Sequence, residues 1–173
     1  VIGVNGKLMY SARPSCDGWI TDHQFLLTYE YTGTPRVDVE TKIASFESYD
    51  GSRMTFSSIR RGNGEIIERI RGNAEMPLQT VKAGSVQYII PEQTALDLSA
   101  GTLFPIAHTR ELIAAAEAGK KVFHVNVFDG GEGKGADEIN ALIGRPVMPI
   151  ATAKHKAKNI DEIAHDIWES QEN

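Results

Sequence analysis

The sequence has little of several things that would define a protein class. It holds a single cysteine, Cys16, so its 173 residues cannot form a disulfide bond among themselves. Its apolar runs are short, such as the five residues of Leu112–Ala116, whereas a membrane-spanning helix needs roughly 18. It has no excess of positive charge, since 18 Lys and Arg against 23 Asp and Glu give a net charge of −5. We therefore expect neither a transmembrane helix nor a nucleic-acid-binding protein.

Sequence motifs of catalysis and cofactor binding are missing as well. There is no G-x-S-x-G nucleophile elbow, and the five histidines lack both the i, i+4 pairing and the cysteine cluster of a zinc site. The segment Gly131–Ala136 fits G-x-G-x-x-A, but Pro146 and Pro149 interrupt the region where a dinucleotide site needs a helix and a second parallel strand. We predict no catalytic residue, no cofactor and no metal, and interpret the glycine-rich segment as a connecting loop.

What the first ninety residues do contain is the pattern of an antiparallel sheet. Apolar and polar residues alternate along Val37–Ile43, which is typical of a half-buried strand. Asp50–Gly51 and Asn63–Gly64 are hairpin-turn signals, because Gly and Asn accept a positive φ. Trp19–Tyr31 and Gln79–Ile90 are further strand candidates. We therefore predict that residues 1–90 are almost entirely antiparallel strand.

Helical patterns come only later in the chain. Thr109–Ala118 is predicted to be the main helix, with Thr109 at its N-cap and Gly119 ending it. A strand is expected over Val122–Phe128, and a last helix over Asn159–Glu169. This order predicts a mostly β (α+β) protein. We expect a β domain over residues 1–150 with the helix at 109–118, followed by a linker and C-terminal helix over residues 151–173.

Two features have two interpretations each. Four aromatic residues at odd-numbered positions, and so an even number of residues apart, point to one face of the predicted strand, where they form either the core face or a groove for an apolar ligand; they are Trp19, Phe25, Tyr29 and Tyr31. Cys16 is either a free, partly buried thiol in a reducing compartment or a cysteine whose partner lies outside this chain.

Three segments together resemble a known family. They are Ser15–Trp19 (S-C-D-G-W), Gly101–Thr109 (G-T-L-F-P-I-A-H-T) and Val127–Gly130 (V-F-D-G). In this order they are similar to the alphaproteobacterial periplasmic family of envelope integrity protein B, over residues 1 to about 150. The resemblance implies a curved antiparallel β-spiral, or incomplete barrel, wrapped around a helix. It also implies an exported, periplasmic and non-enzymatic protein that supports cell-envelope integrity.

The resemblance changes the interpretation of Cys16. In the family, the cysteine of C-D-G-W pairs with a second cysteine near the C-terminus, which has no counterpart here. We therefore expect a bridge whose partner is absent, and a fragment or truncated member that lacks flanking strands. Uncovered sheet edges would then favour pairing with another chain, including a homodimer.

Two classes of function follow. The leading hypothesis is a binding or scaffolding protein, with a lipid, a lipoprotein or an envelope protein as partner. The alternative is a hydrolase that acts on envelope polymers, with Asp17, His108 or Asp129 taking part. An apolar groove without convergent carboxylates would favour the first, and a deep polar cleft that joins such residues would favour the second.

Overall fold

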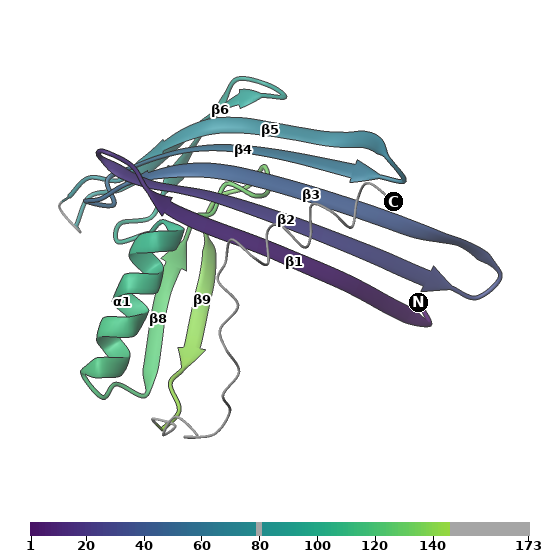
Figure 1. Cartoon of the computed structure of the whole chain (residues 1–173). Helices are drawn as coiled ribbons and strands as arrows, with labels where there is room; N and C mark the ends of the chain where they lie inside the picture. Colours follow the sequence, from purple (N-terminus) through teal and green to yellow (C-terminus); the bar gives the residue numbers. More distant parts are fainter. Residues whose placement is uncertain (79–80, 146–173) are drawn as a thin grey trace. The chain divides into compact units, whose positions relative to one another are not determined.

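The computed structural model describes residues 1–78 and 81–145. Within the unit Val1–Ile143, seven antiparallel strands form one sheet in chain order, and a helix and a two-stranded hairpin follow it (Figure 1). The sheet contains β1 (Gly3–Pro14), β2 (Gly18–Tyr31), β3 (Thr34–Ser48), β4 (Arg53–Gly62), β5 (Glu65–Glu75), β6 (Gly84–Ile90) and β7 (Thr94–Leu98). The later elements are α1 (Pro105–Glu117), β8 (Val122–Val127) and β9 (Asp137–Leu142). The prediction of a mostly antiparallel β protein with one helix is confirmed for the described residues.

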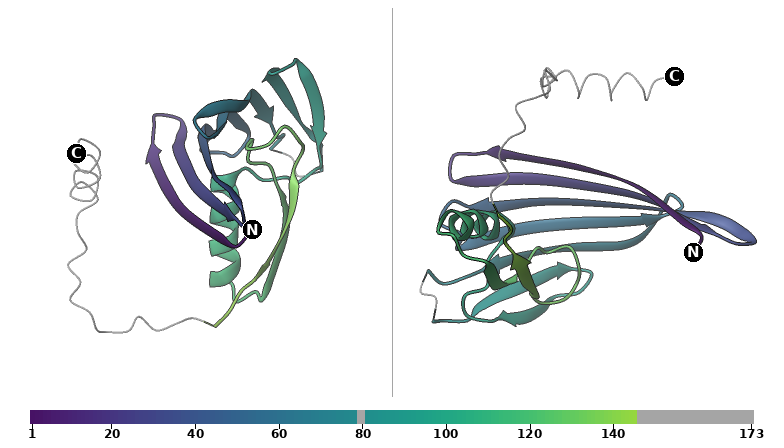
Figure 2. Two further views of the ribbon diagram at one scale, coloured as in Figure 1. Left: turned by 90° about the vertical axis from the view of Figure 1, so that its right-hand side faces the viewer. Right: turned by 90° about the horizontal axis from the view of Figure 1, so that it is seen from below.

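The sheet is an open meander. Each strand pairs with its neighbours in sequence, and β1 and β7 are its two edge strands, so the sheet does not close. The predicted turns are present: Gly51 has φ 70° in the β3–β4 connection, and Asn63 and Gly64 have φ 50° and 87° in the β4–β5 turn. Figure 2 shows the sheet as a curved surface with α1 and the β8–β9 hairpin on its concave side.

The hydrophobic core lies on the concave side, toward one end of the strands. Along residues 53–58 of β4 and 69–75 of β5 every second residue is buried while its neighbours are exposed. Partners in the register share a face, so Met54, Ala74 and Val86 form one buried row across three strands. Two phenylalanines from outside the sheet, Phe104 and Phe128, complete the core. Its buried members are Met54, Phe56, Ile70, Ala74, Met76, Val86, Tyr88, Leu98, Phe104 and Phe128.

Helix α1 begins earlier in the sequence than predicted, and it is more exposed than predicted. It begins at Pro105, because proline fits the first helical position and needs no N–H partner there. The hydroxyl of Thr109 therefore does not cap the helix; it donates back to the Pro105 carbonyl at 2.9 Å. We expected an apolar helix enclosed on most sides by the sheet, but Ala115 is its only buried residue among those described, and the Ile113 side chain is 54% exposed. The helix ends at Glu117, one residue before its predicted end, and Gly119 follows with φ 73°.

The later strands were predicted in part. The predicted strand over Val122–Phe128 is β8, and the glycine-rich segment connects it to β9, which the sequence analysis did not anticipate. No helix begins in this segment, in agreement with its interpretation as a connector. Strand β7 was also missed, because its five residues are too few to show a periodicity. The helix expected over Asn159–Glu169 lies outside the described residues.

Candidate functional site

The segment Ser15–Trp19 forms the turn between β1 and β2, and it packs against the end of β3. Gly18 leaves no room for a side chain, because an added Cβ would lie 2.2 Å from the Glu47 carbonyl oxygen. The backbone N–H of Tyr49 donates to the Asp17 carbonyl at 3.1 Å, and its hydroxyl donates to the Ser15 carbonyl at 2.7 Å. The rings of Trp19 and Tyr49 meet edge to face, with centroids 6.0 Å apart. These contacts fix the turn to β3.

The buried carboxylate of Glu47 joins this end of the sheet to the start of α1. The N–H groups of Ile106 and Ala107 each donate to one of its oxygens at 2.8 Å, and N–H groups in the first turn of a helix have no partner within the helix. Burial raises the pKa of Glu47, although these two hydrogen bonds and the Arg110 charge oppose the rise. Arg110 in turn donates to the Tyr49 carbonyl at 3.1 Å. Glu47 thus caps the helix from a distant strand.

The other two motif segments complete the same assembly. Leu103 and Val127 form a parallel bridge, in which Leu103 N–H donates to the Asn126 carbonyl at 2.9 Å and Phe128 N–H donates to the Leu103 carbonyl at 3.0 Å. Gly130, with φ 71°, lies against the ring of Phe56, and an added Cβ would lie 2.4 Å from that ring. The three segments therefore meet at one end of the sheet, where their contacts are those of a structural joint.

The loop after β8 covers part of the concave face. The Tyr88 hydroxyl lies within hydrogen-bonding distance of the carbonyl oxygens of Glu132, at 3.3 Å, and Lys134. Between this loop and the sheet lies a cavity of about 230 Å³, whose lining includes Phe25, Arg60 and Asp129. The glycine-rich loop therefore docks on the sheet.

The cavity mixes apolar and charged walls. Arg60 forms an ion pair with Glu68 through Nη2 at 2.7 Å, while its buried Nε has no hydrogen-bond partner in the part of the chain that the structure describes. Burial lowers the pKa of His23, which lies on β2 and does not line this cavity, while the charges of Asp129 and Asp22 act in the opposite direction.

Beyond the cavity, the concave face is apolar and carries no covering segment among the described residues. The register places three side-chain rows here, which start at Leu8, Gly6 and Val4 on the edge strand β1. Leu8 is 59% exposed and Val4 56%, while the inner members are partly buried. We call this surface the distal patch; it consists of Val4, Leu8, Phe25, Leu27, Tyr29, Val37 and Val39.

The structure separates the four aromatic residues that the sequence analysis grouped. Phe25 and Tyr29 lie in the distal patch, but Trp19 lies at the opposite end of β2, against Tyr49. Tyr31 is 39% exposed and follows an irregularity in the β2–β3 register. Leu8, Leu27 and Val39 were missed, because period-two alternation identifies a face without showing which part of it the core covers. Whether this surface binds a ligand stays a prediction.

The residues considered for chemistry come from three different elements. Asp17 is in the β1–β2 turn, His108 is in α1 beside the Phe123 ring at 5.9 Å, and Asp129 accepts from Gly131 N–H at 2.8 Å. No hydrogen bond joins any two of these three across the ranges that the structure describes. Cys16 is exposed in the same turn as Asp17, with a free thiol.

The described residues contain neither a metal-binding cluster nor a membrane-spanning helix. No cluster of three or more His, Cys, Asp or Glu in residues 1–78 and 81–145 could hold a metal ion; His155 and His165 lie outside these ranges. No helix there is long and apolar enough to cross a membrane.

An open antiparallel sheet, curved toward one helix and with an apolar concave surface, defines a beta-barrel-like class of protein. The chain belongs to the EipB-like family, whose sequence model matches residues 1–168. It is 31% identical, over 134 residues, to the cell envelope integrity protein EipB of Brucella abortus (strain 2308); this match covers 76% of the chain and 46% of the relative. The chain thus spans about half the length of that curated relative. The family resemblance stated from the sequence is confirmed.

A solved structure supports the same assignment. The crystal structure of a beta-barrel-like protein with a domain of unknown function, also from Brucella abortus, superposes with a TM-score of 0.76 at 27% sequence identity. The match covers 83% of this chain and 58% of that one. The fold described here is therefore shared with this protein over most of the chain.

Proposed function

We propose that this protein supports the integrity of the cell envelope as a non-enzymatic, periplasmic binding protein, and that its distal patch holds the acyl chain of a lipid or lipoprotein. The observation that carries the proposal is the patch itself: seven apolar side chains from three neighbouring strands, with no covering segment among the described residues. Exposed apolar surfaces of this kind mark sites of ligand or partner binding in folded proteins.

The dimensions and energetics of the patch fit a chain-like ligand. Its rows extend over five residues of β2, from Phe25 to Tyr29, whose four steps span about 13 Å along the strand. Each methylene that leaves water contributes about 0.8 kcal/mol. Burial of a few methylenes of an acyl chain therefore gives measurable affinity. The cavity beside Arg60 and Asp129 adjoins the patch through Phe25 and Leu27, and it can receive a polar headgroup.

The proposed role in the cell envelope rests on sequence similarity to a relative. The relative from Brucella abortus is named a cell envelope integrity protein, and lipids and lipoproteins are components of that structure. The hydrolase alternative has less support, because no hydrogen bond joins Asp17, His108 and Asp129 to one another in the described residues. We therefore infer a binding role and not a catalytic one.

The test uses two adjacent leucines that point to opposite faces of β2. Leu27 lies in the distal patch, whereas Leu26 pairs with Lys7 and Glu40 on the convex face. Native mass spectrometry of the 173-residue protein with a single-chain lysophospholipid should show a bound adduct. Leu27→Asp should weaken binding at least about tenfold, because a charge would then face the acyl chain. Leu26→Asp should leave binding unchanged.

Two results would refute the proposal: no adduct on the wild-type protein, or equal binding by both variants. The melting temperature of each variant, measured in the same samples, shows that binding is compared between folded proteins. The same spectra report any homodimer, which we propose would pair through the 12-residue edge strand β1.

A further inference from the structure

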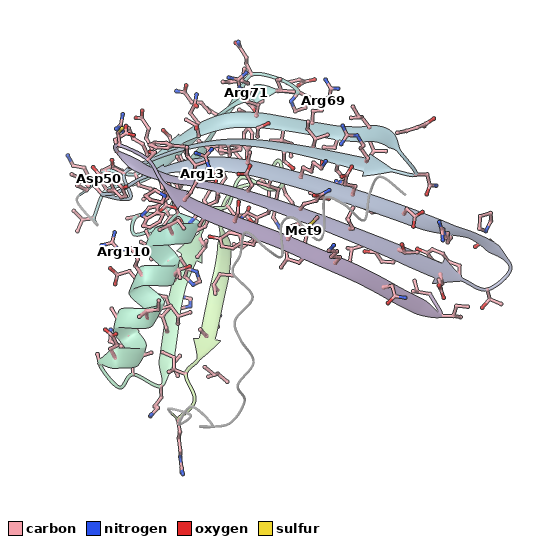
Figure 3. The ribbon with its side chains drawn as sticks, viewed as in Figure 1. Met9, Arg13, Asp50, Arg69, Arg71 and Arg110 are labelled. Atoms are coloured by element: carbon pink, nitrogen blue, oxygen red, sulfur yellow. The ribbon has the colours of Figure 1, made fainter. Side chains whose placement is uncertain are left out.

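The convex face of the sheet carries three exposed arginines. Arg69 and Arg71 alternate with the buried Ile70 and Gly72 on β5, so they project away from the core. Figure 3 shows both at the side of the sheet opposite α1. Arg13 lies on β1, also exposed. No carboxylate in the described ranges forms an ion pair with any of these three arginines.

Between these arginines the convex face is hollow. A shallow depression of about 380 Å³ has an apolar floor that includes Met9, Ala44 and Ile59. The register places Arg69 opposite Ile59 and Arg71 opposite Ser57, at the β5 border of the hollow. Arg13 stands two residues beyond Ser11 on β1, at the other border. An apolar floor is thus flanked by cations on both sides.

The charge balance here is opposite to that of the whole chain. Asp22 is the only carboxylate that lines the hollow, while Lys42 lines it and pairs with Glu40 at 3.1 Å. The three arginines therefore leave an excess of positive charge on the surface of a protein whose net charge is −5. Free guanidinium groups bind phosphate with two parallel hydrogen bonds, and they suit that task better than lysine does.

We propose that the convex face docks on an anionic phospholipid bilayer, with Arg13, Arg69 and Arg71 on lipid phosphates and the apolar floor against the headgroup boundary. A bilayer fits better than a dissolved phosphate, because the hollow is open, wide and apolar at its base. The inference is independent of the distal patch, which lies on the other face of the sheet. It assigns a membrane-surface role to residues that neither the core nor the motif segments use.

Vesicle co-sedimentation tests the inference. The full 173-residue protein should bind vesicles of 70% phosphatidylethanolamine and 30% phosphatidylglycerol and should not bind pure phosphatidylcholine vesicles. The double variant Arg69→Gln/Arg71→Gln should bind about 30-fold more weakly, which is about fivefold per arginine near an anionic surface. Raising the salt to 0.5 M should also weaken wild-type binding, because the contacts are exposed to screening.

The matched control is Lys120→Gln/Lys121→Gln, which removes the same charge from exposed positions after α1 and should retain wild-type binding. An equal loss in this control would overturn the inference, since net charge alone would then explain binding. It is equally overturned if wild-type protein ignores the anionic vesicles, or if 10 mM inorganic phosphate displaces it completely at constant ionic strength. Arg13→Gln, on a separate strand, should weaken binding about fivefold and gives a second reading should the double variant fail to fold.

Discussion

Replacing Glu47 with glutamine tests the link between the sheet and the helix. Glutamine keeps the shape of the side chain but offers one acceptor oxygen, whereas the carboxylate accepts from both Ile106 N–H and Ala107 N–H at 2.8 Å. In Glu47→Gln the amide nitrogen would face one of these donors. We expect the variant to fold and to be less stable than the wild type at pH 7.

The magnitude follows from two opposing effects. A hydrogen bond to a charged group contributes about 1.5–3 kcal/mol, and leaving a buried donor unpaired costs about 1–3 kcal/mol. Relief of the buried charge acts in the other direction, because burial is the main cause that raises the pKa of Glu47. We expect a net loss of about 2 kcal/mol, which for a chain of this size lowers the melting temperature by about 4–8 °C.

The pH dependence gives an independent measurement. Because the folded-state pKa of Glu47 is raised above 4.5, the folded protein binds this proton more tightly than the unfolded chain does. The stability linked to protonation of Glu47 is therefore fully present below about pH 4.5 and is lost as the pH rises through the folded-state pKa, while the two hydrogen bonds to the carboxylate remain above it. Urea unfolding of wild type and Glu47→Gln across this range should show this loss only in the wild type.

The control is Glu75→Gln, the same change at an exposed position of β5, which should alter the melting temperature by less than about 2 °C. If Glu47→Gln matched the wild type in both stability and pH profile, the carboxylate would not be the cap that holds α1, and the argument for a structural joint would fail.

Two further predictions concern the motif loop and the β3–β4 turn. Gly130→Ala should destabilise the fold by about 3 kcal/mol in thermal unfolding, because the added Cβ meets the Phe56 ring and φ is 71°. The control Gly133→Ala should be close to neutral, because no atom lies within 4 Å of its added Cβ. Equal effects of the two variants would contradict the close packing of Gly130. Asp50 accepts hydrogen bonds from Ser48 and Ser52, which lower its pKa from 3.8 to about 2. Any greater stability of the wild type over Asp50→Ala should therefore be present above pH 4 and disappear as the pH falls toward 2. A difference in stability that persists below pH 2 would rule out this titration as its source.

Local patterns were sufficient for most of the sheet, although not for β7. Strand β3 alternates apolar and polar residues over Val37–Ile43, and the turns at Gly51 and Gly64 take the positive φ that their residues predict. These features depend on neighbours in sequence, so one chain reveals them. The family resemblance came from three short segments whose spatial meeting is not visible in any of them alone.

The residue at which α1 begins, and the extent to which the helix is buried, depend on contacts with residues that are distant in the sequence. Thr109 is a good capping residue, but a partner from β3, Glu47, satisfies the helix start four residues earlier, at Pro105. The apolar residues after Leu112 predicted an enclosed helix, yet Ile113 is exposed because no described segment covers it. In the same way, alternation along β2 showed that Trp19 and Phe25 share a face without showing that the core ends between them.

The lengths of the strands explain why part of the concave surface lies outside the hydrophobic core. Strands β2 and β3 have 14 and 15 residues, while β6 and β7 have 7 and 5. The register between β3 and β4 stops at Val39 and Gly62, so the far ends of β2 and β3 extend beyond the strands that carry the core. Apolar side chains on that extension gain little from the core, and polar ones would cost the fold little. Their apolar character is therefore better explained by contact with something outside the described residues than by the stability of the sheet.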